Sequence, residues 1–183
     1  MKKLMTVTAA LLIAVVALAQ APAKKYGVKS ATVKVATVMM DQKTENISYF
    51  DDYGAKEVTQ MEMMGMKMTQ LSLDGKMYII NADQKQVQEM PAQESVNYLN
   101  LTPEIIAKYK VKTVGKETVA GKECTKYTAE ISQMGQTAKA EVSVWNGYAM
   151  KSVIDMGGFK ISTEVVEFKE GPVDAKLFEV PKF

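Results

Sequence analysis

The clearest fold signal is a run of strand-forming residues interrupted by one tight turn: Val144-Trp145-Asn146-Gly147-Tyr148-Ala149-Met150-Lys151. Both central residues of a type I′ turn need a positive φ, and the dipeptide Asn146-Gly147 tolerates it. The stretch therefore predicts a β-hairpin. Its two-residue turn would place Trp145 directly opposite Tyr148 as an aromatic cross-strand pair.

Similar turn signals recur between segments that alternate apolar and polar residues. They predict about eleven strands, six before a helical insert and five after it, and the first two are expected over 28–40 and 45–52. So many strands on a short chain must curl to bury one face and limit exposed edges. We therefore expect a mainly β fold with short helices, in which a strongly curved antiparallel sheet forms a half-open barrel. The other turn signals are Tyr53-Gly54, Met64-Gly65, Asp74-Gly75, Ala120-Gly121 and Gly157-Gly158.

The alternation stops between Ala92 and Lys110. Thr102 followed by Pro103 is typical of a helix N-cap and first turn, and Ile105, Ile106 and Tyr109 then recur at helical spacing. This insert is expected to lie across the concave side of the sheet as a cover. Further helical turns are expected over 94–99 and after Pro172-Val173-Asp174, before Phe178.

The first residues have the features of a secretory signal peptide. Lys2 and Lys3 precede an apolar run from Ala9 to Leu18, and Ala17-Leu18-Ala19 matches the small-x-small pattern that signal peptidase cuts. We expect cleavage between Ala19 and Gln20, a flexible segment over 20–27 and a single domain over 28–183. Because the apolar run is short and no second one follows, the sequence predicts no stable membrane insertion and a location in the periplasm or outside the cell.

Composition removes many functions. The chain has no histidine and no arginine. This composition excludes Ser-His-Asp and Cys-His catalysis, imidazole zinc sites and guanidinium clamps. We expect no enzymatic activity and no cofactor. The signal peptide holds two of the 23 basic residues, which leaves 21 against 21 acidic residues, a balance that argues against nucleic acid as a partner. Cys124 is the only cysteine, so no intrachain disulfide forms, and we expect a buried thiol in a monomer.

The most unusual segment is rich in methionine and runs from Met61 to Met68. If Met64-Gly65 is a two-residue turn, Met61 faces Met68, Met63 faces Met66, and all four side chains share one side of the ribbon. A bulge at the turn gives a similar result. Three interpretations remain open: core packing, a compliant apolar lining for a ligand, and a Cu(I) site, since thioethers are soft ligands.

Several segments resemble the envelope lipoprotein-carrier fold typified by the LolA and LolB carriers. They are 73–78, 121–127, 144–151, 165–168 and 177–181. The resemblance implies an incomplete barrel whose apolar concave face, covered by short helices, receives an acyl chain or another hydrophobic small molecule. This chain lacks the arginine that holds the lid of those carriers, so lipoprotein chaperoning itself is not implied. A scaffold that binds another protein, without a small ligand, is a further alternative. The candidate lining residues are Met61, Met63, Met66, Met68, Ile105, Ile106, Tyr109 and Trp145.

Overall fold

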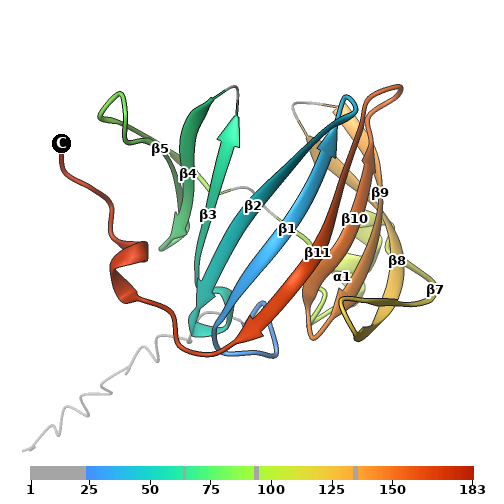
Figure 1. Ribbon diagram of the computed structural model, residues 1–183. Helices are drawn as coiled ribbons and strands as arrows, with labels where there is room; N and C mark the ends of the chain where they lie inside the picture. The colour runs from blue at the N-terminus through green and yellow to red at the C-terminus, as the bar shows by residue number, and fades with distance from the viewer. Residues whose placement is uncertain (1–23, 64, 93–94, 134–135) are drawn as a thin grey trace, which may run out of the picture.

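The computed structural model describes residues 24–63, 65–92, 95–133 and 136–183. The expected signal peptide and its cleavage site therefore lie outside the described residues. Eleven strands form one antiparallel sheet in the order β6-β5-β4-β3-β2-β1-β11-β10-β9-β8-β7 (Figure 1). The strands are β1 (Ala31–Met39), β2 (Gln42–Asp51), β3 (Lys56–Met63), β4 (Met66–Leu73), β5 (Lys76–Asn81), β6 (Gln86–Pro91), β7 (Lys112–Val119), β8 (Lys122–Gln133), β9 (Gln136–Trp145), β10 (Tyr148–Asp155) and β11 (Lys160–Glu170).

Six strands precede the helical insert and five follow it, as the turn signals predicted, and β1 pairs with β11. The sheet is strongly curved and stays open between its edges, as a half-barrel (Figure 1). The first strand is shorter than predicted and begins at Ala31. Residues 28–30 lie outside it and bond elsewhere: Lys29 O accepts a hydrogen bond from Tyr53 N–H at 2.9 Å, and Ser30 O accepts one from Gly171 N–H at 3.2 Å.

The insert joins the two edge strands. Because β6 and β7 lie at opposite edges of the sheet, the connection from Ala92 to Val111 has to cross one of its faces; we call this connection the strap. It contains helix α1 (Pro103–Tyr109), where the Thr102 side chain accepts a hydrogen bond from Ile105 N–H, as the N-cap prediction required. The helical turn expected over 94–99 is wrong for 95–97, which are irregular. The Asn97 side chain instead accepts from the backbone N–H groups of Leu99 and Asn100.

The two faces of the sheet are covered by different segments. Directly paired residues share a face, so Phe50, Glu57, Ser72 and Met77 lie together on what we call the inner face. The strap crosses this face, with Tyr98 packed on Tyr127 of β8 at 5.4 Å between ring centroids.

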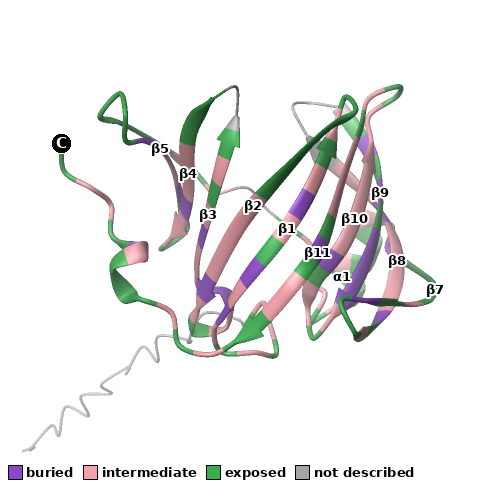
Figure 2. Cartoon of the chain, in the orientation of Figure 1, coloured by how far each residue is buried: buried purple, intermediate pink, exposed green. Residues whose placement is uncertain are grey.

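The opposite, outer face of β3 to β5 carries the buried side chains of Val58, Leu71 and Ile80. The C-terminal segment covers them through Phe178 of the 3-10 helix η2 (Ala175–Phe178), the short turn predicted after Asp174. Asp174 caps it by accepting a hydrogen bond from Lys176 N–H. In Figure 2 the buried positions are concentrated in the middle and lower parts of the strands, and the strand tips are exposed. Within the described residues, no helix is long and apolar enough to cross a membrane.

Aromatic side chains cluster at the end of the half-barrel that holds the β9–β10 turn, which we call the base. Trp145 pairs with Tyr148 across the β9–β10 turn, as predicted, and Asn146 and Gly147 both have positive φ. Tyr26 lies between Phe50 and Tyr148, with centroid distances of 4.7 and 5.0 Å. This cluster anchors the segment before β1 to the sheet.

Candidate ligand-binding site

Strand β4 carries a change from polar to apolar along the inner face. Every second residue of a strand points to the same side, so Ser72, Gln70, Met68 and Met66 all lie on the inner face of β4. Their partners on β5 are Met77 opposite Ser72, Ile79 opposite Gln70 and Asn81 opposite Met68. A polar end near the base thus leads to a methionine-rich end at the β3–β4 turn.

The methionine hairpin has the register predicted from its sequence. Met61 pairs with Met68, Met63 with Met66 and Glu62 with Lys67, with no bulge in the ladder. Met61 and Met68 are half-buried, and Met66 is 42 % exposed. Met64 lies outside the described residues. The pairing puts Met61, Met66 and Met68 on the inner face of two neighbouring strands.

A hollow of about 610 Å³ lies beside this hairpin. We call it the methionine hollow. Apolar surface comes from Met66, Met68, Ile79 and Val87, and the polar rim comes from the end of β5, the β5–β6 turn and β6. The remaining lining residues are Asn81, Gln84, Lys85, Gln86 and Gln88.

A second hollow, of about 290 Å³, lies nearer the base on the same face. We call it the polar hollow. Lys25 Nζ lies 2.7 Å from Glu57 Oε1, and the Tyr26 hydroxyl donates to Glu57 Oε2 at 3.1 Å. Burial first, and the Glu57 carboxylate second, raise the pKa of both Tyr26 and Tyr148, so both phenols remain protonated donors at neutral pH. The lining is Lys25, Tyr26, Glu57, Thr59, Gln70, Ser72, Met77 and Ser95.

The middle of the inner face is more polar than the resemblance implied. Ser48 and Thr59 share a hydrogen bond of 2.9 Å between β2 and β3, and Ser152 and Thr163 share one of 2.7 Å between β10 and β11. Apolar side chains return on β8 to β10, where Val142 and Val144 form a buried cluster with Tyr98 of the strap packed against it. The inner face is therefore amphipathic.

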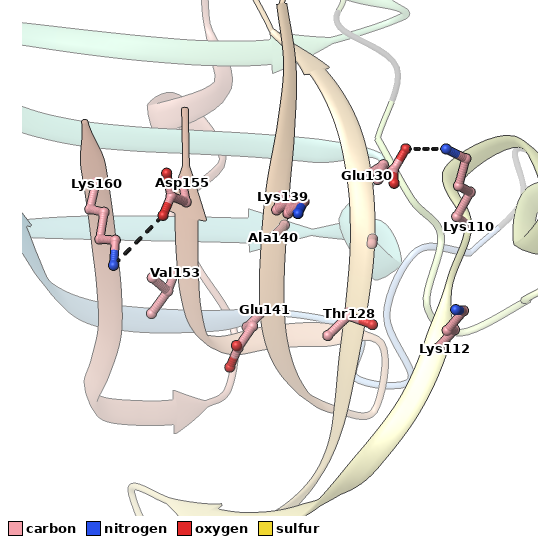
Figure 3. A pocket seen from close by; sticks show the side chains of 11 residues that line it. Lys110, Lys112, Thr128, Glu130, Lys139, Ala140, Glu141, Val153, Asp155 and Lys160 are labelled. Atoms are coloured by element: carbon pink, nitrogen blue, oxygen red, sulfur yellow. Dashed lines mark hydrogen bonds and ion pairs between the residues drawn. The ribbon is translucent and has the colours of Figure 1, made fainter. Parts of the chain in front are cut away.

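A third hollow, of about 360 Å³, lies on the outer face of β8 to β11 (Figure 3). Its charges alternate across neighbouring strands: Glu130 is paired with Lys139, Lys139 with Asp155, and Asp155 with Lys160. Lys110 completes the row through a contact of 2.5 Å with Glu130. Each charge in this row has an opposite neighbour, and the lining as a whole holds four lysines against three carboxylates. Because these charges are largely compensated, we assign this surface no binding role.

The residues that line the methionine hollow do not include Met61, Ile105, Ile106, Tyr109 or Trp145. Helix α1 has no buried residue; Ile105 and Tyr109 are half-buried and Ile106 is exposed. None of the three lines any of the hollows described above. Trp145 is partly buried and packs against the core cluster at the base; its ring lies edge-on to Phe168 at 5.3 Å and under the Lys122 ammonium at 4.1 Å.

The sequence interpretation missed the polar hollow. Tyr26 fell within the segment expected to be flexible, and the sequence interpretation assigned no role to Gln70 and Ser72. One signal was present: Thr59, Gln70 and Ser72 have the same parity as the methionines on their strands, so the hairpin register already placed them on the same face.

An open antiparallel half-barrel, crossed by a helical strap and hollowed on its inner face, is the architecture of the lipoprotein-carrier fold. The sequence resemblance is therefore confirmed at the level of fold. The chain belongs to the family of the domain of unknown function DUF4412, whose family model matches residues 30–145. No curated protein matches the chain in sequence.

Solved structures share this fold at low sequence identity. An uncharacterized conserved protein from Thermus thermophilus has a TM-score of 0.60 and 13 % identity, over 84 % of this chain and 86 % of that one. The MucA/MucB complex of Pseudomonas aeruginosa has a TM-score of 0.54 and 16 % identity, over 81 % of this chain and 54 % of that one. A separate structure of MucB has a TM-score of 0.53 and 14 % identity, over 84 % and 57 %. The chain spans only about half of these longer chains, and identities this low establish the shared fold alone.

Proposed function

We propose that the mature protein is a non-enzymatic envelope protein that binds a hydrophobic molecule on the inner face of its half-barrel. The observation that carries this proposal is the methionine hollow of about 610 Å³. Pockets for small molecules typically measure about 300–1,000 Å³ and are lined by apolar side chains with a few polar groups. The hollow has this size and this mixture.

The lining suits a flexible ligand. The thioether chains of Met66 and Met68 are unbranched and polarizable, so they adjust to ligands of different shape. Ile79 adds a rigid apolar surface beside them, and each Å² of apolar ligand surface buried there contributes about 25 cal/mol. An acyl chain or a similar hydrocarbon is the ligand class that this surface favours.

Native purification tests the proposal. The mature protein should co-purify with a lipid visible by native mass spectrometry, and it should bind the uncharged probe N-phenyl-1-naphthylamine. Met68→Asp places a charge in the hollow and should weaken probe binding by about tenfold or more. The matched control is Met40→Asp, because Met40 is 73 % exposed and lies outside the hollow. A protein that is uniformly empty and ignores the probe would contradict the proposal.

Export is part of the same proposal. A periplasmic or secreted location follows from the signal-peptide features of residues 1–19. Sequencing the N-terminus of the protein recovered from the envelope fraction should give Gln20 as the first residue. Recovery of the intact chain in the cytoplasm would refute export.

A second candidate is a scaffold that binds another protein. MucB, a protein with the same fold, was solved in complex with MucA(peri). Here both edge strands are open to pairing, and all of β6 except Met90 is exposed. A protein that co-purifies at one-to-one stoichiometry, with the hollow empty, would favour this candidate.

Cu(I) binding is the remaining candidate, and the hairpin register favours it because Met61, Met66 and Met68 share one face and Met63 is paired with Met66. Clustered thioethers select Cu(I) among the biological metal ions. A competition titration with a Cu(I) chelator tests it. Affinity that is unchanged after all four methionines are replaced by leucine would exclude the site.

A further inference from the structure

We infer that the ligand is an amphiphile with an uncharged, hydrogen-bonding head group, held in the polar hollow while its chain lies along the methionine hollow. This inference rests on the proposed function and adds the polarity, the charge and the direction of the ligand. It follows from how the two hollows adjoin and from the groups that line the polar one.

The two hollows lie next to each other along one strand. Ser72 and Gln70 line the polar hollow, and Met68 and Met66 line the methionine hollow. These four side chains are successive inner-face positions of β4, so they lie about 7 Å apart and span about 20 Å. On β5 the same boundary falls between Met77 and Ile79. A single elongated molecule lying along β4 would therefore meet polar groups at one end and apolar groups at the other.

The polar hollow offers free hydrogen-bonding groups. Within the described residues, the side chains of Gln70, Ser72 and Ser95 make no hydrogen bond, whereas Thr59 is already paired with Ser48. A glutamine amide and two hydroxyls provide both donors and acceptors. They match a head group made of hydroxyl, ester or amide functions.

The charges in this hollow disfavour an ionic head group. Lys25 is the only cation of the lining and is already bonded to Glu57 at 2.7 Å. An anionic head group would compete with Glu57 for Lys25 and would be repelled by that carboxylate. A cationic head group would compete with Lys25 for Glu57 and would be repelled by the Lys25 ammonium. Because the pair neutralises itself, an uncharged head group is the one that binds without breaking it.

Three amphiphiles with the same dodecyl-length chain test this inference: lauroyl glycerol, dodecyl phosphate and dodecylammonium. Each displaces N-phenyl-1-naphthylamine from the mature protein at neutral pH, and the displacement curve gives its affinity. Lauroyl glycerol should bind about tenfold more tightly than either ion. Gln70→Leu combined with Ser72→Ala should remove this preference.

Glu57→Gln tests the role of charge, since it removes the carboxylate at nearly constant shape. The affinity for dodecyl phosphate, relative to that for lauroyl glycerol, should rise about tenfold, because Lys25 is then unpaired. The matched control is Glu123→Gln, an exposed glutamate in the same kind of lysine pair with Lys116, which should change nothing. Each ratio is measured within one variant, so a loss of stability affects both ligands equally.

The possible results distinguish failure of the head-group assignment from failure of the proposed function. Dodecyl phosphate binding as tightly as lauroyl glycerol to the unmodified protein would overturn the inference and leave the proposed function standing. Failure of the probe and of all three amphiphiles to bind would overturn the proposed function as well.

Discussion

Replacing Phe178 by alanine tests how the C-terminal segment stabilises the sheet. Phe178 is 6 % exposed and packs against Val58, Leu71 and Ile80 on the outer face. An aromatic side chain buries about 150–250 Å², which at about 25 cal/mol per Å² amounts to about 4–6 kcal/mol. Alanine retains part of this contact, and measured core substitutions of Phe by Ala cost about 3–5 kcal/mol. Because η2 lies near the chain end and can relax, we expect a loss of about 3 kcal/mol in the free energy of unfolding.

Urea unfolding monitored by the fluorescence of Trp145, the only tryptophan, measures this loss. With a slope of about 2 kcal/mol per M, the midpoint should fall by about 1.5 M. Thermal unfolding should occur about 6–12 °C lower. Trp145 packs against the core cluster at the base, which does not include Phe178, so a change in its transition reports unfolding of the whole sheet.

The control is Phe183→Ala, the same substitution at a residue that is 59 % exposed, and it should shift the midpoint by little. Probe binding should survive Phe178→Ala, since the methionine hollow is on the opposite face. Equal midpoints for the two variants would refute the view that the outer-face cluster holds the C-terminal segment in place.

Three further predictions follow from local features of the structure. Thr102→Ala removes the N-cap of α1 and should cost about 1 kcal/mol, which hydrogen exchange over 103–110 would detect as faster exchange; unchanged exchange would argue against the cap. Gly147→Ala places a methyl group against the Lys25 carbonyl and 2.9 Å from Leu99 Cβ, so it should lower the melting temperature. The shift should exceed that of Gly75→Ala, a control position with a similar φ but open space around it, and equal shifts would contradict this packing. Burial raises the pKa of the Cys124 thiol, so Ellman's reagent should modify it slowly at neutral pH and rapidly in urea, and equal rates would contradict its burial.

The elements that the sequence predicted correctly depend on neighbours within a few residues. The Asn146-Gly147 turn follows from the φ angles that these two residues tolerate, and it fixes the pairing of Trp145 with Tyr148. The register of the methionine hairpin follows from a two-residue turn and the two-residue period of a strand. Helix α1 follows from Thr102 and Pro103 at its start.

The candidate lining residues on α1 show where local spacing is not sufficient. Ile105, Ile106 and Tyr109 recur at helical spacing, which normally marks a buried face. No residue of α1 is buried, and its partly covered side chains line none of the hollows described above. Which face of a short helix is covered depends on what lies across from it, and the spacing alone does not contain that information.

By itself, the sequence determined the approximate number of strands, the turns that join them, and the register of the methionine hairpin. All of these follow from backbone preferences and from alternation over short distances. Only the tertiary structure decided which face is inner. The strap crosses one side of the sheet, where Tyr98 packs on it, and Phe178 covers the other side. Both contacts join residues distant in sequence, and for that reason the polar hollow around Glu57 appeared only once the chain had folded.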